Sequence, residues 1–163
     1  MDLNEFELED LLLAAIKSEE ESNKLYSKMM KKTKNGLLQD KLEFLAKEEQ
    51  KHREFIEEIY SNHFPEKKLV IPDQTPVPMP EVKITEETPL SVLLKEAMNA
   101  EQSASDFYKN LAGRFEQGSK INNTLMYFAD MEIEHKKILE MEKESMERYE
   151  EDDVYWPMIH VGP

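Results

Sequence analysis

Six side chains in this sequence could bind metal ions, and they form two sets with the same order. Each set has one glutamate, followed further along the chain by a Glu-x-x-His pair. The sets are Glu19, Glu49 and His52 in the first half, and Glu101, Glu132 and His135 in the second half. All six interrupt apolar series that recur every three or four residues, which is the spacing of the buried face of a helix.

Burying these side chains together requires a counter-charge. Four carboxylates in a protein core repel one another, and each costs several kcal/mol unless it is paired or binds metal. Two divalent cations would supply four positive charges against four negative charges, with both histidines neutral. Carboxylates bridge hard cations, and imidazole binds iron, zinc or manganese. The pattern therefore predicts a carboxylate-bridged two-metal centre inside a four-helix bundle.

Two tyrosines accompany this pattern. Tyr26 and Tyr108 follow Glu19 and Glu101 at the same spacing, two helical turns along the same face. Two interpretations stay open. The rings could be ordinary core aromatics, or their hydroxyl groups could donate hydrogen bonds to a metal-binding carboxylate.

The two halves of the chain repeat each other. A constant shift along the sequence aligns Glu19 with Glu101 and Tyr26 with Tyr108, together with the leucines and alanines that precede them. Beyond the next turn a slightly longer shift aligns His52 with His135, which an insertion in the second turn explains. The repeat predicts two similar helix pairs.

The apolar spacing predicts an all-α fold with four helices and a C-terminal tail. The expected ranges are 5–34, 37–62, 88–115 and 120–148 for the helices and 149–163 for the tail. Asn35-Gly36 and Gln117-Gly118-Ser119 suit a helix stop and restart. Thr88-Pro89 predicts an N-cap followed by proline at the first helical position.

Six of the eight prolines lie between residues 65 and 89, so this stretch cannot be a helix. It could be a flexible linker between two domains or a crossover that runs along one bundle. We favour a crossover over 64–89 within a single domain, 1–148, because neither half could hold four carboxylates by itself. The apolar residues expected along the bundle are Leu69, Val70, Ile71, Val82 and Ile84.

Composition excludes several functions. The chain has 163 residues, no cysteine and a formal net charge of −14. Without cysteine there is no disulfide, iron–sulfur cluster or rubredoxin-type iron site. The negative charge argues against nucleic acid and anionic membranes as partners. The acidic N-terminus does not look like a signal peptide, and the longest apolar run, 11–16, is too short to span a bilayer, so we expect a cytoplasmic protein.

Four strings carry a resemblance to a known family. They are AIKSEEESNKLY and FLAKEEQKH in the first half, and EAMNAEQSASDFY and YFADMEIEH in the second half. Over residues 5–148 the chain resembles the ferritin-like superfamily, and most closely the rubrerythrin-type di-iron domain without its rubredoxin module. The resemblance implies a ferritin-like antiparallel bundle with a long crossover between the second and third helices.

The same resemblance implies roles for the six side chains around two iron ions, for which zinc or manganese could substitute. It makes Glu19 and Glu101 terminal ligands, Glu49 and Glu132 bridges, and His52 and His135 ligands of one iron each. Family chemistry is the oxidation of Fe(II) by dioxygen or hydrogen peroxide, or the reduction of peroxide.

Two positions depart from relatives. Rubrerythrins carry a further ligating glutamate where this chain has Ala104, and bacterioferritins have a haem-binding methionine where it has Gln50. We therefore expect no haem, and rubrerythrin-type peroxidase activity is less strongly indicated than Fe(II) oxidation.

Three functions compete on this basis. We favour a di-iron oxidoreductase of oxidative-stress and iron handling, a homodimer that would need an external electron donor if it is a peroxidase. The alternatives are iron storage in a ferritin-like cage and a non-catalytic bundle that holds structural metal.

The tail contains the only tryptophan, within an apolar cluster near the C-terminus. We expect it to fold back on the bundle or to dock on another subunit. His160 is not expected to be a metal ligand.

Overall fold

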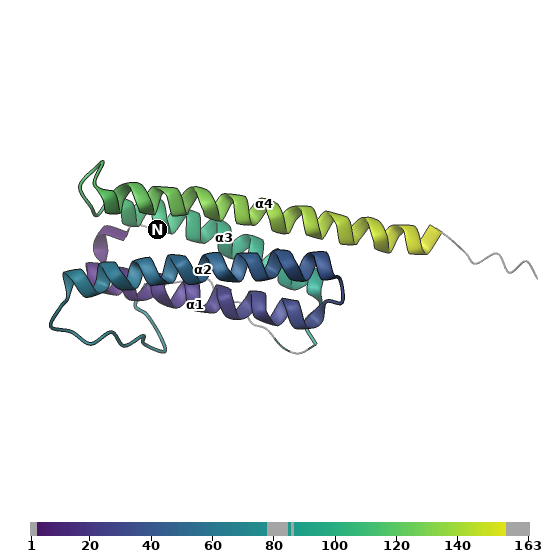
Figure 1. Ribbon diagram of the computed structural model, residues 1–163, viewed down its shortest axis with the longest axis horizontal. Coiled ribbons are helices and arrows are strands. Elements are labelled where there is room, and N and C mark those ends of the chain that lie inside the picture. The colour runs from purple at the N-terminus through teal and green to yellow at the C-terminus, as the bar shows by residue number, and fades with distance from the viewer. Residues whose placement is uncertain (1–2, 78–84, 86, 156–163) are drawn as a thin grey trace, which may run out of the picture.

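The computed structural model describes residues 3–77, 85 and 87–155 of the chain. A short 3-10 helix (Leu3–Glu5) precedes four α-helices. These are α1 (Leu8–Lys32), α2 (Gly36–His63), α3 (Leu90–Ala112) and α4 (Lys120–Tyr155). The described part of the chain has no strand, and the helices lie along one another as an all-α bundle, as predicted (Figure 1).

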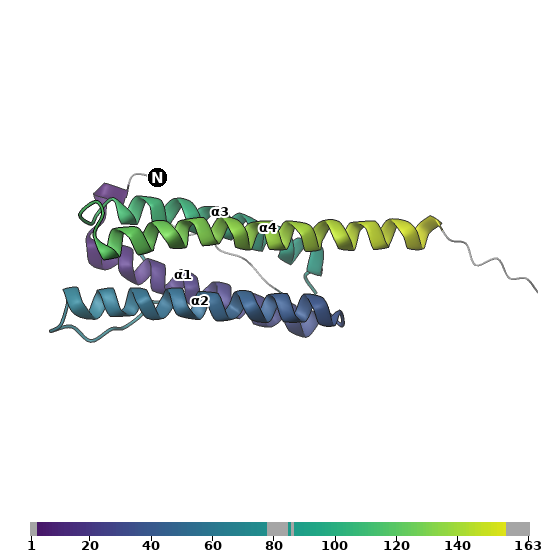
Figure 2. The ribbon, with the colours of Figure 1, turned by 45° about the horizontal axis from the view of Figure 1, so that its top comes forward.

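The bundle is built from two antiparallel helix pairs. α1 packs mainly against α2, and α3 packs mainly against α4. The pairs form two layers, with α1 beside α3 and α2 beside α4 (Figure 2). α2 ends at one end of the bundle and α3 begins at the other, so their connection spans its length (Figure 1). This arrangement confirms the long crossover between the second and third helices.

The crossover contacts the bundle through some of the residues expected to do so. Leu69 and Ile71 are partly buried against the core, and Val77 is fully buried. Val70 is instead exposed, while Val82 and Ile84 lie outside the described residues. Lys17 of α1 donates a hydrogen bond to the carbonyl oxygen of Pro72 at 3.2 Å, which ties the crossover to the first helix.

The internal repeat is visible in the contacts between helices. Asn23 Nδ2 donates to the carbonyl oxygen of Ala46 across the first pair, and Ser105 Oγ donates to that of Ala129 across the second, both at 2.7 Å. The two donors correspond to each other in the repeat, and so do the two acceptors. Alanine at the acceptor positions leaves room for the neighbouring helix, so both pairs are joined at equivalent positions of the repeat.

The helix ends follow local sequence. Asn35 caps α2, because its side chain accepts hydrogen bonds from the amides of Leu37 and Leu38. Gly118, in the turn before α4, has a φ of 79°, a conformation that side chains other than glycine rarely adopt. Both turns were predicted from these residues.

Two predicted helix boundaries are wrong. Thr88 does not cap α3, because Pro89 occupies the capping position, and the Thr88 hydroxyl contacts Thr85 instead. α4 does not end at Arg148 but continues to Tyr155. No glycine or proline interrupts it before Pro157, so nothing in the local sequence stops the helix earlier.

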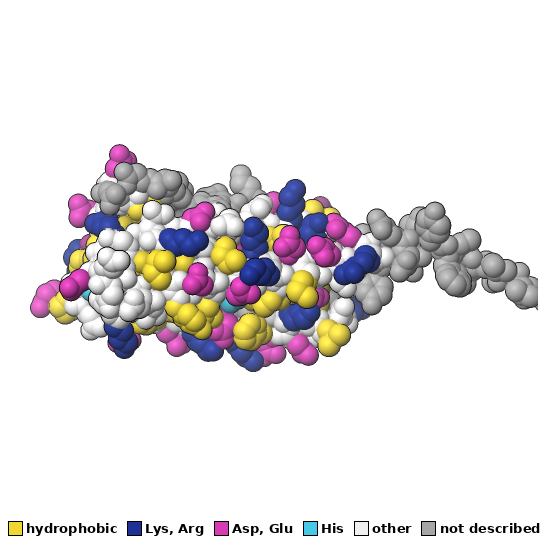
Figure 3. Space-filling model, turned by 90° about the horizontal axis from the view of Figure 1, so that it is seen from above, with side chains coloured by type: hydrophobic (Ala, Val, Ile, Leu, Met, Phe, Trp, Pro, Cys, Tyr) yellow, Lys and Arg dark blue, Asp and Glu magenta, His cyan; other side chains and the backbone are white. Residues whose placement is uncertain are grey.

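The core has two apolar clusters with a polar layer between them. On α1, for example, Leu12 belongs to one cluster and Met29 to the other, with Glu19 between them. The outer face seen in Figure 3 shows acidic and basic side chains interspersed with single apolar ones. Among the helices that the structure describes, none has a stretch apolar and long enough to cross a membrane.

Candidate metal centre

The polar layer contains all six side chains that the sequence singled out. Each comes from the middle of a helix, with one glutamate from α1, one from α3 and a Glu-x-x-His pair from α2 and from α4. Their exposed fractions lie between 0% and 3%. The Glu-x-x-His spacing puts each glutamate and histidine of a pair on one helix face, and the antiparallel packing brings the four faces to one level.

The six side chains form two overlapping groups. Within each group the potential ligand atoms all lie within 4.8 Å of one another. The groups are Glu19, Glu49, His52 and Glu132, and Glu49, Glu101, Glu132 and His135. Glu49 and Glu132 belong to both groups, so each could contact two cations, whereas the other four side chains could contact one.

The distances show how the two shared glutamates are placed. Glu132 Oε1 lies 2.8 Å from Nδ1 of His52, and Glu132 Oε2 lies 3.1 Å from Nδ1 of His135. Glu49 Oε2 lies 3.7 Å from Nδ1 of His52, and Glu49 Oε1 lies 3.2 Å from Nδ1 of His135. Each shared carboxylate therefore directs one oxygen to each histidine, as a bridge between two cations requires.

The outer glutamates complete each group. Glu19 Oε2 lies 3.9 Å from Nδ1 of His52, and Glu101 Oε2 lies 3.8 Å from Nδ1 of His135. Both Nδ1 atoms thus face carboxylate oxygens, while both Nε2 atoms have no hydrogen-bond partner among the described residues. The outer partner expected for the second ring nitrogen is not found there.

Several buried polar atoms in this layer lack a hydrogen bond within the part of the chain that the structure describes. They are the Oε1 atoms of Glu49, Glu101 and Glu132, both ring nitrogens of His52 and Nε2 of His135. Nδ1 of His52 lies 2.8 Å from Glu132 Oε1 but does not form a hydrogen bond with it. Buried polar groups are normally satisfied. An unsatisfied set rich in carboxylate oxygens and imidazole nitrogens fits divalent transition-metal ions.

Burial and mutual repulsion set the protonation of the metal-free layer. Burial, together with the charge of the neighbouring Glu49, raises the pKa of Glu19 well above its usual value. Burial and the nearby Glu132 do the same to the pKa of Glu101. Burial opposes ionisation of the shared glutamates too, but the outer carboxyls and the histidines close to them lower the pKa of Glu49 and Glu132.

The histidines respond to the same carboxylates. Burial favours the neutral ring, but the adjacent carboxylates outweigh it and raise the pKa of His52 to about 9 and that of His135 to about 12. These shifts favour charged histidines and ionised shared glutamates, and they shift the outer glutamates toward the neutral form. Two dications would bind by displacing protons from these groups.

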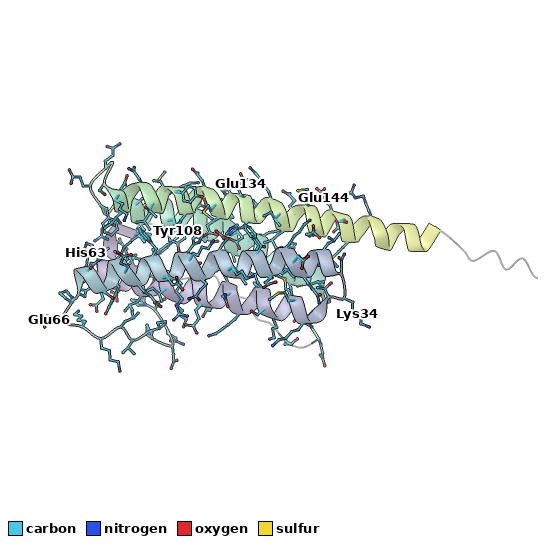
Figure 4. The ribbon with its side chains drawn as sticks, viewed as in Figure 1. Lys34, His63, Glu66, Tyr108, Glu134 and Glu144 are labelled. Atoms are coloured by element: carbon cyan, nitrogen blue, oxygen red, sulfur yellow. The ribbon has the colours of Figure 1, made fainter. Side chains whose placement is uncertain are left out.

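The two tyrosines differ. Tyr108 lies on α3, and its hydroxyl donates a hydrogen bond to Glu19 on the antiparallel helix α1. Figure 4 labels Tyr108 inside the bundle. Burial raises the pKa of Tyr108 well above its usual value, so the phenol stays protonated and can donate. Tyr26 packs in the apolar cluster with Leu25 and Met29, and its hydroxyl has no partner in the described structure.

One contact was not anticipated from the sequence. The ring of Phe128 packs on the imidazole of His52, with ring centroids 4.1 Å apart and an interplanar angle of 32°. Phe128 lies in the apolar stripe of α4, and the spacing indicated only that it is a core residue. Its packing partner is on another helix, and sequence spacing does not reveal such a contact.

Comparison with known proteins agrees with this arrangement. Residues 10–142 match the family model described as Rubrerythrin. The structure is similar to that of a hypothetical protein from Pyrococcus furiosus, with 33% sequence identity and a TM-score of 0.77. The match covers 90% of this chain and 94% of that one. Among curated proteins no match is found.

Proposed function

Because this chain belongs to the rubrerythrin family, we propose that its six buried side chains bind two iron ions and that the protein is an oxidoreductase. The proposed reaction is the oxidation of Fe(II) by dioxygen or hydrogen peroxide, in oxidative-stress and iron handling. Iron suits the donor set of carboxylates and imidazoles. Zinc or manganese could occupy the same ligands.

One observation carries the proposal. Glu49 and Glu132 each direct their two oxygens toward two different histidines, which supports two cations held side by side rather than one. In two-metal sites of this kind the ions lie about 3.5–4 Å apart. We assign the two shared glutamates as bridges, and Glu19 and Glu101 as terminal ligands.

The side chains would have distinct tasks in the reaction. When bound, the iron pair supplies two electrons, which together with two protons reduce one hydrogen peroxide molecule to two waters. The histidines would bind through Nδ1 as neutral rings, and the outer glutamates as carboxylates. Tyr108 would hold Glu19 through its hydroxyl hydrogen. Burial of the whole layer excludes bulk water from the site.

The test is rapid mixing of anaerobic, Fe(II)-loaded protein with dioxygen or peroxide, followed by absorption of the oxidised iron. We expect two Fe(II) per chain to be oxidised in wild type and almost none in Glu132→Ala. Glu134→Ala is the matched control, because Glu134 lies close by on α4 but is exposed and pairs with Lys137 at 2.7 Å (Figure 4).

The same preparation separates the other functions. Two bound metals without oxygen or peroxide reactivity would show a structural metal site. A large hollow assembly in size-exclusion chromatography, in place of the homodimer that we propose, would show iron storage.

A further inference from the structure

The two halves of the metal centre differ in how their outer glutamates are held. Tyr108 donates a hydrogen bond to Glu19. The repeat-equivalent residues are Tyr26 and Glu101, and these do not form the equivalent bond. Neither the Tyr26 hydroxyl nor Glu101 Oε1 has a hydrogen-bond partner anywhere in the described ranges. A phenol therefore fixes one outer glutamate and leaves the other without this support.

The two histidines also differ in their aromatic contacts, and His52 has more of them than His135. The ring of His52 is packed by Phe128 at 4.1 Å and meets the edge of the Tyr108 ring at 6.1 Å. Phe55 in turn contacts Phe128 edge to face, with ring centroids 5.3 Å apart and an interplanar angle of 81°. Among the described aromatic contacts, His135 has one, with His52 itself at 5.8 Å.

The sequence explains this difference. The same shift that aligns His52 with His135 also aligns Leu45 with Phe128, and Phe55 with Ile138. The repeat therefore preserves the metal ligands but replaces an aromatic wall with aliphatic side chains in one half. Flat rings that pack face to face or edge to face restrict the orientation of an imidazole.

A ligand that is already held in place loses less conformational freedom when it binds a metal. We infer that the two metal positions are not equivalent, and that the position at Glu19 and His52 binds metal first and more tightly. This inference rests on the proposed two-metal function. The two bridges are common to both positions, so the difference arises from the outer glutamates and histidines. Tyr108 is thus a positioning residue that acts through Glu19.

The test is a titration of metal-free protein with Co(II) alone, followed by calorimetry and by Co(II) absorption. Wild type should bind two equivalents in two resolved steps. Tyr108→Phe should weaken the first step by about 10-fold or more, which is the usual effect of removing a hydrogen bond to a ligand. Tyr26→Phe is the matched control, because it removes the same atom at the repeat-equivalent buried position, and both steps should be unchanged.

Equal effects of the two substitutions, or a larger effect of Tyr26→Phe, would overturn the inference, as would two indistinguishable steps in wild type. A single equivalent in wild type would instead refute the two-metal site itself. Circular dichroism of each metal-free variant checks its fold. If Tyr108→Phe does not fold, Glu101→Ala should retain the tight step and Glu19→Ala only the weak one. The reverse order would show the inference to be wrong.

Discussion

At the scale of single residues, the four glutamates divide into two kinds by their surroundings. Glu49 and Glu132 have lowered pKa values and face both histidines. Glu19 and Glu101 have raised pKa values because they are buried next to another carboxylate. Their positions, rather than their residue type, separate the proposed bridges from the proposed terminal ligands.

This division predicts different effects of alanine substitution. Glu49→Ala or Glu132→Ala should abolish the oxidation of an iron pair, because a bridge contacts both metals. Glu19→Ala should retain more activity, because a terminal ligand contacts one. Stopped-flow oxidation rates at matched iron loading measure the effect, and equal residual rates in all three variants would contradict the assigned roles.

The pKa shifts predict how the stability of the metal-free protein depends on pH. Groups with raised pKa values stabilise the fold fully below the pKa of the unfolded chain, about 6.5 for histidine, and lose this contribution as pH rises through the folded pKa. The raised pKa of His52, about 9, therefore makes the protein less stable as pH rises from 6.5 to 9, and the raised pKa of His135 acts in the same direction. The raised pKa values of Glu19 and Glu101 also lower the stability as pH rises, beginning at about 4.5, the value for the unfolded chain.

Urea unfolding in the presence of a chelator should show that the free energy of unfolding falls as pH rises. The fall is up to about 1.4 kcal/mol per pH unit for each proton that the folded state retains and the unfolded chain releases. The metal-loaded protein is the control, because its histidines are neutral and its carboxylates ionised, so the fall should be absent. A metal-free protein that becomes more stable toward pH 9 would contradict the proposed protonation of this layer.

The lowered pKa values of Glu49 and Glu132 affect stability at acid pH. The stabilisation that these two ionised carboxylates contribute is lost as pH falls below about 4.5.

At the scale of elements, the turns decide where each helix pair closes. Gly118 has a φ of 79°, and its amide donates to Asn122 Oδ1 at 3.2 Å. Gly36, at the start of α2, has no heavy atom within 4 Å of the place where a Cβ would lie. The two glycines occupy corresponding turns but have different conformational demands.

Gly118→Ala should therefore lower the free energy of unfolding by about 1 kcal/mol, because a Cβ disfavours the left-handed conformation. Gly36→Ala is the matched control and should be neutral or slightly stabilising, because alanine favours the helix. Urea denaturation of the two variants measures the difference. An equal loss in both would show that backbone conformation does not limit this turn.

At the scale of the whole molecule, the candidate metal site lies between the two helix pairs. Every pair contributes ligands to both groups, so metal bound to the folded state should hold the layers together. Removal of metal should lower the melting temperature. Binding to the folded state alone contributes about 4 kcal/mol at a thousandfold excess over Kd. An unchanged melting temperature after chelation would show that the site does not stabilise the bundle.

The C-terminal end of α4 lies away from this layer. The helix continues past the turn between α1 and α2 (Figures 1 and 2), and the expected apolar anchor from Trp156 onward lies outside the described residues, as does His160. Deletion of residues 152–163 should leave two metals per chain but lower stability or change the oligomeric state. Metal analysis and size-exclusion chromatography test this, with His160→Ala as the control. Loss of one metal in both variants would place His160 in the site.

Much of the fold and of the candidate site could be predicted from the sequence, because the signals are local. A Glu-x-x-His pair occupies one face of any helix, and Glu19 and Glu101 each interrupt an apolar stripe that must be buried. The concentration of prolines between the halves excludes a helix there. These features determined the four helices, the crossover and the six side chains that meet.

The tertiary structure alone decided how those side chains pair. Tyr108 follows Glu101 on the same helix, yet it donates to Glu19, because two turns along a helix separate two side chains by about 10 Å while an antiparallel neighbour can bring one closer. The packing of Phe128 on His52 likewise depends on contacts between helices. The sequence by itself determined which residues are buried at the centre. The packing of the two helix pairs decided which oxygen faces which histidine, because that depends on the relative positions of four helices, which spacing within one helix does not specify.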